Sequence, residues 1–556
     1  MINYFLDNFK NLSNLDRVAL VDKNNNQISW KKYYNYCSQF SNALKNINIS
    51  KEQSIGIMGF NSPEWFYSAI GSIMYSKYVG IYATNGPKEV DYIFNMCNVA
   101  VFVVENMQLL ENLKITYPLK LIILYNDQFN KRYYNDIPII NFYDFIENSS
   151  NIPIQNNIQP ESTICYYMTS GTTGSSKVVE ITYKNMSYTC GLFFTLSNFP
   201  ERILSYLPLS HTAGSRTDMF YHFYHGGIVY FGNGSELKGN LINSLQKVRP
   251  TIFLSVPRIW EKLSDDINKI KRNSIIPECI THFFKKKTLE YNNYIGQINN
   301  ISFFTIICYL ISRLIICNSI KRNIGLNNCR TYYNTASNIS KKTLDYFAEI
   351  DIPIYEMYGM TETCGVISVN YKNNYKKYSV GKPFYGEVKL GWDNEIIYRG
   401  ANIFKKYKYN YKDTEKTLKD GWLYTGDIGE FDDDGYLYIT GRKKDLIKTS
   451  GGENISPLKI ETEIKEYAPN IDQIIIIGEG RNFLSALIFM KDYNEEYIKK
   501  AIDKYNQNAI SKAQQIKKYI VINDDLTVDN GLLTQTMKMK RNIIEKKYQK
   551  IIDDIY

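Results

Sequence analysis

The sequence is poor in the residues that bind metals or form disulfide frameworks. Its 556 residues include nine cysteines, none of them in a C-x-x-C pair, and only four histidines. An odd number of scattered cysteines predicts free thiols in a reducing compartment. No cysteine cluster accompanies the histidines, which argues against a zinc site.

Long apolar runs are also scarce. Residues 1–7 lack a basic stretch followed by a long apolar run, so we do not expect a signal peptide. The apolar run 301–316 is shorter than the ~20 residues that a membrane span needs, and Arg313 interrupts it. We therefore expect a helix lying on or in the protein. Basic residues at 285–287 and 321–322 flank the run, so docking on a bilayer without crossing it stays an alternative.

The charge balance is only mildly basic. Lys and Arg outnumber Asp and Glu by 66 to 56, and the net charge of +10 fits anionic substrates or an anionic membrane surface. It is no sign of nucleic-acid binding. A hydrophobic content of 44% is that of a folded protein, and 556 residues are too many for one core. We expect a multidomain protein that is not secreted and lies on the cytoplasmic face, either free or peripheral on an intracellular membrane.

Short apolar runs alternate with helical segments along most of the chain. We expect strands at 54–60, 80–82, 99–105, 119–125, 251–256 and 331–334. Strands that alternate with helices over this length predict an α/β lobe with mainly parallel sheets. Residues 259–326 have a helical, Lys-rich pattern, which predicts a helical excursion from the sheets with solvated charges.

The last part of the chain is rich in turns. Residues 432–435 are typical of a hairpin turn. A compact α+β segment follows, with a helix expected near 456–467 and strands at 473–477 and 485–490. The stretch 441–445 is charged and has few apolar residues, as a hinge should. We therefore expect a large N-terminal domain (1–440), a hinge (441–445) and a small mobile C-terminal domain (446–556).

One run rich in glycine and hydroxyl groups is the strongest chemical signal. It consists of Thr169, Ser170, Gly171, Thr172, Thr173, Gly174, Ser175, Ser176 and Lys177. Its glycines let a phosphate approach the backbone, its hydroxyls are short donors, and Lys177 adds a positive charge. The spacing differs from that of the G-x-x-x-x-G-K-[ST] phosphate loop. A surface turn has the same composition, so the run needs partners elsewhere in the sequence.

Three later blocks could supply those partners. The first contains Met357, Tyr358, Gly359, Met360, Thr361 and Glu362. In it an aromatic ring could stack on a purine, and a carboxylate could hold Mg²⁺. The second is Asp427 with Arg442, where an acidic side chain could accept from both ribose hydroxyls. The third is the basic block 531–541. Alone, they have plainer interpretations: a helix N-cap, a Gly-Asp turn and a solvated tail.

Together and in this order, the blocks resemble the adenylate-forming superfamily of acyl-CoA synthetases, and most closely the long-chain fatty acid–CoA ligases. The resemblance covers nearly the whole chain and rests on YMTSGTTGSSK, YGMTE, YTGD, GRKKDLIKTSGGENISP and LLTQTMKMKR. The blocks at 80–85 and 207–211 are similar to those of the bubblegum-type branch. Residues 405–407 depart from the family pattern without removing a group that the chemistry requires.

The resemblance implies roles in a first, ATP-consuming step. Lys177 and Lys538 would be catalytic, the latter between the fatty carboxylate and the α-phosphate. Thr361 would contact the α-phosphate, Glu362 would ligate Mg²⁺, and His211 would line the acyl pocket near the reacting carboxylate. ATP would be bound by residues 169–177, Met357, Tyr358, Gly359, Met360, Thr361, Asp427, Arg442 and Lys538.

It also implies roles in a second step, the formation of a thioester. Lys444 matches the hinge position, and Lys448 matches a lysine that faces the site after the small domain has turned. Gly451 and Gly452 would border the tunnel for the pantetheine arm of CoA, where only a residue without a side chain lets the arm pass.

The implied function is ATP-dependent ligation of a long-chain fatty acid to CoA through an acyl-adenylate, with Mg²⁺ as cofactor and release of pyrophosphate and AMP. One alternative is transfer of the acyl group to a carrier-protein thiol. The other is an inactive scaffold of the same fold, against which the intact Lys177, Glu362, Asp427, Arg442 and Lys538 argue. Acyl chain length and oligomeric state are left open.

Overall fold

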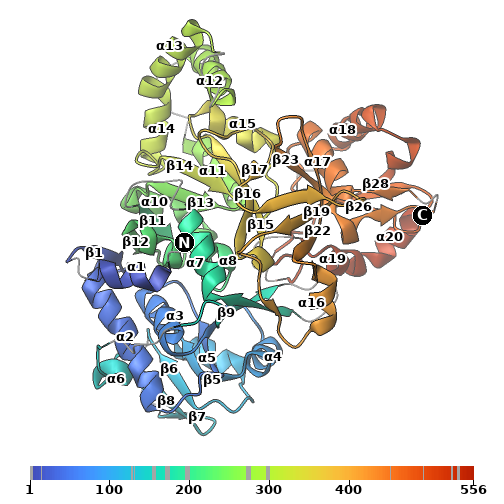
Figure 1. The fold of residues 1–556 in the computed structure, drawn as a ribbon. Helices are drawn as coiled ribbons and strands as arrows, with labels where there is room; N and C mark the ends of the chain where they lie inside the picture. Colours follow the sequence, from blue (N-terminus) through green and yellow to red (C-terminus); the bar gives the residue numbers. More distant parts are fainter. Residues whose placement is uncertain are drawn as a thin grey trace.

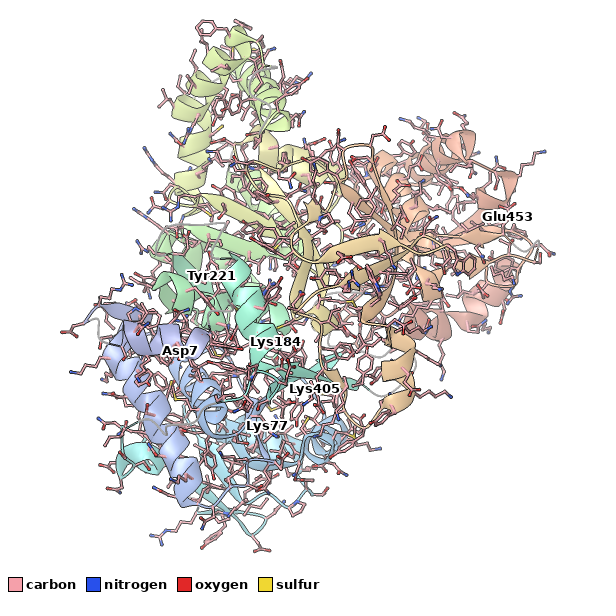
Figure 2. All side chains as sticks on the ribbon, in the orientation of Figure 1. Asp7, Lys77, Lys184, Tyr221, Lys405 and Glu453 are labelled. Carbon is pink, nitrogen blue, oxygen red and sulfur yellow. The ribbon has the colours of Figure 1, made fainter. Side chains whose placement is uncertain are left out.

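A computed structural model gives the fold of the chain (Figure 1). It describes residues 4–13, 16–126, 129, 132–152, 158–169, 176–193, 201–270, 277–295, 301–450, 453–491, 494–527, 530–534 and 539–556. We call the part up to residue 442 the large lobe and the part from residue 447 the small lobe. Figure 2 labels Lys405 in the large lobe and Glu453 in the small lobe.

A nine-stranded sheet forms the base of the large lobe. Its strand order is β20-β10-β9-β4-β3-β5-β6-β8-β7. The strands from β9 to β8 in this order pair in parallel, whereas β10, β20 and β7 pair antiparallel at the edges. Their bounds are β3 (Ser54–Met58), β4 (Tyr78–Ile81), β5 (Val99–Val104), β6 (Leu121–Leu124), β7 (Tyr133–Tyr134), β8 (Ile137–Asn141), β9 (Thr163–Thr169), β10 (Lys177–Thr182) and β20 (Lys406–Tyr407).

The sequence of this sheet explains its parallel centre. All six residues of β5, VAVFVV, are buried, as expected for a strand covered on both faces by helices. The helix α3 (Pro63–Tyr75) begins where Ser62 accepts a hydrogen bond from the backbone N–H of Trp65, with Pro63 in the first turn. With α3, α2 (Trp30–Asn46) packs on one face of the sheet, and α4 (Pro87–Cys97) and α5 (Met107–Leu113) pack on the other.

Three further sheets complete the large lobe. A four-stranded sheet has the order β11-β12-β1-β2, a five-stranded sheet has the order β13-β14-β15-β16-β17, and an antiparallel sheet contains β18, β19, β21, β22 and β23. The first two consist of β1 (Val18–Val21), β2 (Gln27–Ser29), β11 (Arg202–Ser205), β12 (Ile228–Phe231), β13 (Ile252–Ser255), β14 (Thr331–Asn334), β15 (Ile354–Met360), β16 (Gly365–Val369) and β17 (Lys382–Pro383). The third consists of β18 (Glu387–Leu390), β19 (Glu395–Arg399), β21 (Leu418–Lys419), β22 (Trp422–Phe431) and β23 (Leu437–Arg442).

The fold class predicted from the sequence is confirmed. Each predicted strand of the α/β part overlaps an observed one, and the hairpin turn at 432–435 joins β22 to β23. The structure adds the wholly antiparallel sheet of β18, β19, β21, β22 and β23, which alternation with helices does not reveal.

The predicted helical excursion begins with a helix packed in the core of the large lobe and then projects away from that lobe (Figure 1). It contains α11 (Pro257–Ile270), α12 (Glu278–Asn293), α13 (Phe303–Ser312), the π-helix η6 (Arg313–Cys317) and α14 (Asn318–Asn323). The last three form one continuous helical segment, Phe303–Asn323, which is long and apolar enough to cross a membrane by length and composition alone. The length expected from the apolar run 301–316 was too short, because the helix continues beyond the run into polar residues. About a third of its most apolar stretch, 33%, is buried in the protein.

The small lobe is built around a three-stranded sheet of β26 (Gln473–Ile477), β27 (Leu484–Phe489) and β28 (Ile516–Ile522). A hairpin of β24 (Ile447–Lys448) and β25 (Asn454–Ile455) precedes it, and the helices are α17 (Pro457–Tyr467), α18 (Glu495–Asn508), α19 (Arg541–Lys547) and α20 (Gln549–Ile555). Its two hydrophobic clusters consist of residues from Ile447 on, whereas those of the large lobe end at Ile439. The exact domain limits and the hinge at 441–445 stay predictions.

An ion pair joins three elements of the small lobe. Arg541 of α19 donates to both carboxylate oxygens of Glu461 in α17, at 2.6 and 2.8 Å, and to the carbonyl of Ile476 in β26 at 3.0 Å. Glu461 is buried and also accepts from the backbone N–H of Ile476 at 2.8 Å. Removing the carboxylate would leave a largely buried guanidinium without its counter-charge.

We therefore predict that Glu461→Ala lowers the free energy of unfolding of the small lobe by about 3 kcal/mol. The matched control is Glu496→Ala, which breaks an exposed i,i+4 pair with Lys500 and should cost about 0.5 kcal/mol or less. Hydrogen exchange of the β26 peptide in the full chain measures both. Equal exchange in Glu461→Ala and wild type would contradict the prediction.

Candidate active site

The run 169–177 is the connection of an antiparallel hairpin. Strands β9 and β10 are in register so that Thr169 lies opposite Lys177. Residues 170–175, between them, lie outside the described residues. The spacing of glycines and lysine in the run had indicated that it is not the common G-x-x-x-x-G-K-[ST] phosphate loop. The hairpin agrees, because that loop connects a strand to a helix. Ser176 accepts a hydrogen bond from the hydroxyl of Tyr92 at 3.0 Å through its carbonyl.

Lys177 has a carboxylate partner that the sequence did not reveal. Its Nζ lies 2.7 Å from Oδ2 of Asp413, in α16 (Tyr411–Thr417), and 4.8 Å from the ring centroid of Tyr407. The hydrogen bond from Lys177 lowers the pKa of Asp413 below its usual value. Both side chains are partly exposed, so an incoming phosphate can compete for the ammonium group.

Glu362 is buried directly after β15, in the short helix η7 (Thr361–Thr363). The hydroxyl of Tyr407 donates to its Oε1 at 2.6 Å, and its carbonyl accepts from the backbone N–H of Phe404 at 2.7 Å. Burial raises the pKa of Glu362, while the Tyr407 hydrogen bond and the charges of Arg442 and Lys177 act against that rise. Tyr407 thus contacts both Glu362 and Lys177.

Tyr358, Asp427 and Arg442 form a second group. The hydroxyl of Tyr358 donates to Oδ2 of Asp427 at 2.8 Å, and Nε of Arg442 lies 2.8 Å from Oδ1 of the same carboxylate. The pairing of β22 with β23 sets Asp427 directly opposite Arg442. Asp427 is buried, and its charge raises the pKa of Arg442. After Tyr358 the chain needs glycine, because a Cβ at Gly359 would collide with the carbonyl oxygen of Gly365.

A cleft of about 790 Å³ lies between the two lobes. The large lobe contributes Ser176, Tyr358, Gly359, Asp427 and Arg442 to its walls, and the small lobe contributes Leu533, Thr534, Met539, Lys540 and Arg541. Lys538 lies outside the described residues. The described residues nearest to it in the sequence, Thr534 and Met539, both line the cleft.

The residues predicted for the second step are placed differently. Lys444 lies in the short helix η8 (Lys443–Asp445) between the lobes, where partial burial and then the charge of Arg442 lower its pKa. Lys448 is exposed on β24, and its backbone N–H donates to Glu479 at 2.8 Å. Lys448 is absent from the cleft walls formed by the described residues. Gly451 and Gly452 lie outside the described residues.

A second, apolar cavity adjoins the cleft. Met357 lines both, and the cavity measures about 40 Å³. Its walls come from β11, β13, β14 and the π-helix η2 (Ser215–Phe220), and they include Leu204, Phe253, Leu254 and Tyr333. Sequence spacing could not assemble this cavity, because its walls come from six separate segments of the chain. A π-helix is rare and often occurs at functional sites.

Polar residues of η2, Arg216, Thr217 and Asp218, also line this cavity, whereas His211 is absent from the described residues that line it or the cleft. His211 precedes η2 through α8 (Thr212–Gly214), where its Nδ1 accepts from the backbone N–H of Ala213 at 3.2 Å. Asp218 of η2 lies in the cavity wall, and burial raises its pKa to about 7. Tyr221, labelled in Figure 2, lines the cavity immediately after η2.

Comparisons with known proteins agree with this geometry. The AMP-binding enzyme family matches residues 10–408, and the AMP-binding enzyme C-terminal domain matches residues 444–556. The long-chain-fatty-acid–CoA ligase ACSBG2 of Gallus gallus is 31% identical over 97% of this chain and 79% of that protein. The long-chain-fatty-acid–CoA ligase ACSBG1 of Mus musculus is 31% identical over 99% of this chain and 84% of that protein.

Solved structures share the fold. The anthranilate CoA ligase AuaEII, in complex with anthranoyl-AMP, superimposes with a TM-score of 0.78 at 19% identity, over 99% of this chain and 98% of that one. ATP-bound MatB from Rhodopseudomonas palustris superimposes with a TM-score of 0.75 at 18% identity, over 98% and 99% of the two chains. With the family matches across both lobes, the chain belongs to the AMP-binding enzymes and, among them, to the bubblegum-type long-chain-fatty-acid–CoA ligases.

Proposed function

We propose that this protein joins a long-chain fatty acid to CoA at the expense of ATP, through an acyl-adenylate. One observation carries the proposal: the Tyr358–Asp427–Arg442 group lines the large-lobe side of the cleft between the lobes. Ser176, which precedes Lys177 of the Lys177–Tyr407–Glu362 group, lines the same cleft. The Lys177–Tyr407–Glu362 group suits a polyphosphate, and the Tyr358–Asp427–Arg442 group suits a nucleoside. The relatives are named long-chain-fatty-acid–CoA ligases, which is why we propose a long-chain fatty acid and CoA as the other two substrates.

The Tyr358–Asp427–Arg442 group would hold the nucleoside of ATP. Asp427 keeps acceptor capacity beyond the bonds from Tyr358 and Arg442, because a carboxylate has about four lone-pair sites. Those two bonds fix the orientation of the carboxylate toward the ribose hydroxyls. The ring of Tyr358 would stack on adenine, beside Met357, Gly359 and Met360.

The Lys177–Tyr407–Glu362 group would hold the phosphates. Residues 169–177 would wrap them with backbone N–H and hydroxyl groups, and Lys177 would exchange its partner Asp413 for a phosphate oxygen. Thr361, at the start of η7, would donate to the α-phosphate.

The donor set fits Mg²⁺ at Glu362. Tyr407 occupies Oε1 of this buried carboxylate, and the nearby Lys177 and Arg442 favour its ionised form. Among the described residues, no group of three or more His, Cys, Asp or Glu side chains could hold a metal. Glu362 would therefore be one of several Mg²⁺ ligands, and phosphate oxygens and water would supply the others, as is usual for Mg²⁺. The bound ion would neutralise phosphate charge.

In the first step a carboxylate oxygen of the fatty acid bonds to the α-phosphorus, and the bond to pyrophosphate breaks. Two anions must approach each other, so the protein contributes positioning and positive charge. Lys177 would stabilise the phosphates from the large lobe. Lys538 would stabilise the attacking carboxylate and the α-phosphate from the small lobe.

In the second step the CoA thiolate attacks the acyl carbon and AMP leaves. Lys448 is exposed and outside the cleft walls in this arrangement, so the small lobe would have to turn about Lys444 to bring it to the site. Gly451 and Gly452 follow Lys448 closely and would border the CoA arm.

The apolar cavity would receive the start of the acyl chain. It opens next to the cleft at Met357, with His211 one turn before its π-helix wall. Its volume of about 40 Å³ is room for about three water molecules. A long acyl chain would therefore have to displace wall side chains, and η2 is the wall segment with the least regular hydrogen bonding.

The direct test is a panel of fatty acids of increasing length, supplied with ATP, Mg²⁺ and CoA to the purified protein. We expect AMP and acyl-CoA in equal amounts, with the highest kcat/KM for long chains. Formation of ADP, or of acyl-adenylate without acyl-CoA, would contradict the proposal, and the second result would favour a carrier-protein acceptor.

Tyr407→Phe tests the phosphate-side group. Loss of a hydrogen bond to a charged group costs about 1.5 kcal/mol, so acyl-adenylate formation should fall roughly tenfold at neutral pH. The hydrogen bond favours ionised Glu362, so its loss raises the pKa of Glu362 and moves the acid limb of the pH–rate profile to higher pH.

The matched control is Tyr409→Phe, a change at an exposed tyrosine two residues away. It should leave both rate and pH profile unchanged. An unshifted acid limb in Tyr407→Phe would show that Glu362 does not need this partner.

Lys538→Ala and Lys448→Ala should separate the two steps. Removing a charge that stabilises one transition state costs about a hundredfold in that step. We expect Lys538→Ala to slow formation of the acyl-adenylate, and Lys448→Ala to slow only its conversion to acyl-CoA. Single-turnover assays of each half-reaction measure both rates.

Lys499→Ala, at an exposed position of α18, controls for loss of a surface charge. If Lys448→Ala slowed both half-reactions equally, the turning of the small lobe would lose its support. If Lys538→Ala formed acyl-adenylate at the wild-type rate, the role of Lys538 would be wrong.

A further inference from the structure

The helical segment Phe303–Asn323 has its polar side inward and its apolar side outward. Along α13 and η6 the buried residues include Thr305, Cys308, Tyr309 and Ser312. The exposed apolar residues of the same turns, which we call the apolar face, are Phe303, Phe304, Ile307, Leu310, Ile311, Leu314 and Ile315. Phe303 is 77% exposed and Leu314 is 73% exposed. A helix at the surface of a protein in water normally has the opposite arrangement.

Hydrogen bonds fix this orientation. The hydroxyl of Thr288 in α12 donates to Ser312 at 2.7 Å, and the hydroxyl of Thr305 donates to Glu290 at 2.8 Å. The hydroxyl of Tyr309 donates to Asp351 at 3.1 Å. Turning the apolar face inward would break all of these bonds and leave buried polar groups without partners.

The neighbouring helix α12 also exposes apolar side chains. Its Ile280 and Phe283 are 45% and 44% exposed. The rings of Tyr291 and Tyr309 stack at 3.7 Å and hold α12 against α13. In Figure 1 these two helices stand away from the sheets, so the surface is at the end of a projection. An apolar patch of this kind marks a contact with a protein or a membrane.

The surrounding charges favour an anionic lipid surface. Between residues 278 and 323 there are six Lys or Arg residues and two Glu residues. Lys286 and Arg322 are exposed, and Arg313 is about half exposed within the helix itself. A projecting shape with apolar and basic side chains can enter the headgroup region of a bilayer, where each basic residue near an anionic surface adds to the attraction.

The same contacts argue against a membrane span. The inner side of the helix is hydrogen-bonded to α12, and Lys321 at its end forms a buried ion pair with Asp351 at 2.5 Å. A spanning helix would have to break these contacts and carry Lys321 and Arg322 into or across the bilayer. Surface docking keeps them intact.

We propose that the apolar face of α13 and η6, with Ile280 and Phe283 of α12, docks the protein on the surface of an anionic lipid bilayer. The contact buries the apolar face at the headgroup–acyl boundary and leaves the cleft in water. This docking surface is inferred from the exposed residues and hydrogen bonds of α12, α13 and η6 alone, so it does not depend on the reaction proposed at the cleft. With the proposed substrate, it would hold the enzyme where long-chain acids partition.

Flotation of the full chain with vesicles tests this. One set of vesicles is phosphatidylcholine with about a third phosphatidylserine, and the other is phosphatidylcholine alone. We expect the wild type to float with the first set, and the double variant Phe303→Asp, Leu314→Asp to bind at least about tenfold more weakly. Binding should also weaken at high salt and on the neutral vesicles.

Ile510→Asp is the matched control, because Ile510 is 77% exposed in the small lobe. It should float as the wild type does. All three proteins should have equal melting temperatures, since the changed side chains are mostly exposed. Unchanged flotation of the double variant, or no flotation of the wild type, would overturn the proposal. Sedimentation that shows a wild-type dimer and a monomeric double variant, without vesicle binding, would assign the face to a second copy instead.

Discussion

The hydroxyl of Tyr407 is the contact on which the phosphate side of the site depends. It donates to buried Glu362, and its ring lies beside the ammonium group of Lys177. The fold places it there because β20 pairs with β10, the strand that begins at Lys177. The carboxylate proposed for Mg²⁺ and the lysine proposed for phosphate are thus held together before ATP arrives. That arrangement reduces the reorganisation needed when charge develops in the reaction.

The helices, strands and motif blocks could be predicted from the sequence, but the contacts between them could not. The run VAVFVV becomes the fully buried β5, and the strand expected at 473–477 has the observed bounds of β26. In the sequence, Tyr407 could be recognised only as part of a departure from the family pattern. Its place beside Glu362 and Lys177 depends on pairing with a strand more than 200 residues earlier. Asp413 and the apolar cavity were missed for the same reason. The roles given to Lys538, Gly451 and Gly452 still rest on the sequence.

The two proposed functional surfaces have different solvents: the cleft faces water, and the apolar face contacts lipid. The cleft carries the charged groups, and the projection of α12 and α13 carries the apolar face. The inverted polarity of α13 was not visible in its composition, which is simply apolar. It became visible once Thr288 and Glu290 were found to bond its polar residues from α12. The length of an apolar run is therefore less informative here than the side on which its few polar residues lie.

The central claim is that ATP is split between the α- and β-phosphates by a fatty carboxylate, before CoA takes part. Exchange of labelled pyrophosphate into ATP measures this directly. The account predicts exchange that requires the fatty acid and Mg²⁺ and proceeds without CoA. Exchange that requires CoA, or formation of ADP and inorganic phosphate without any exchange, would contradict it.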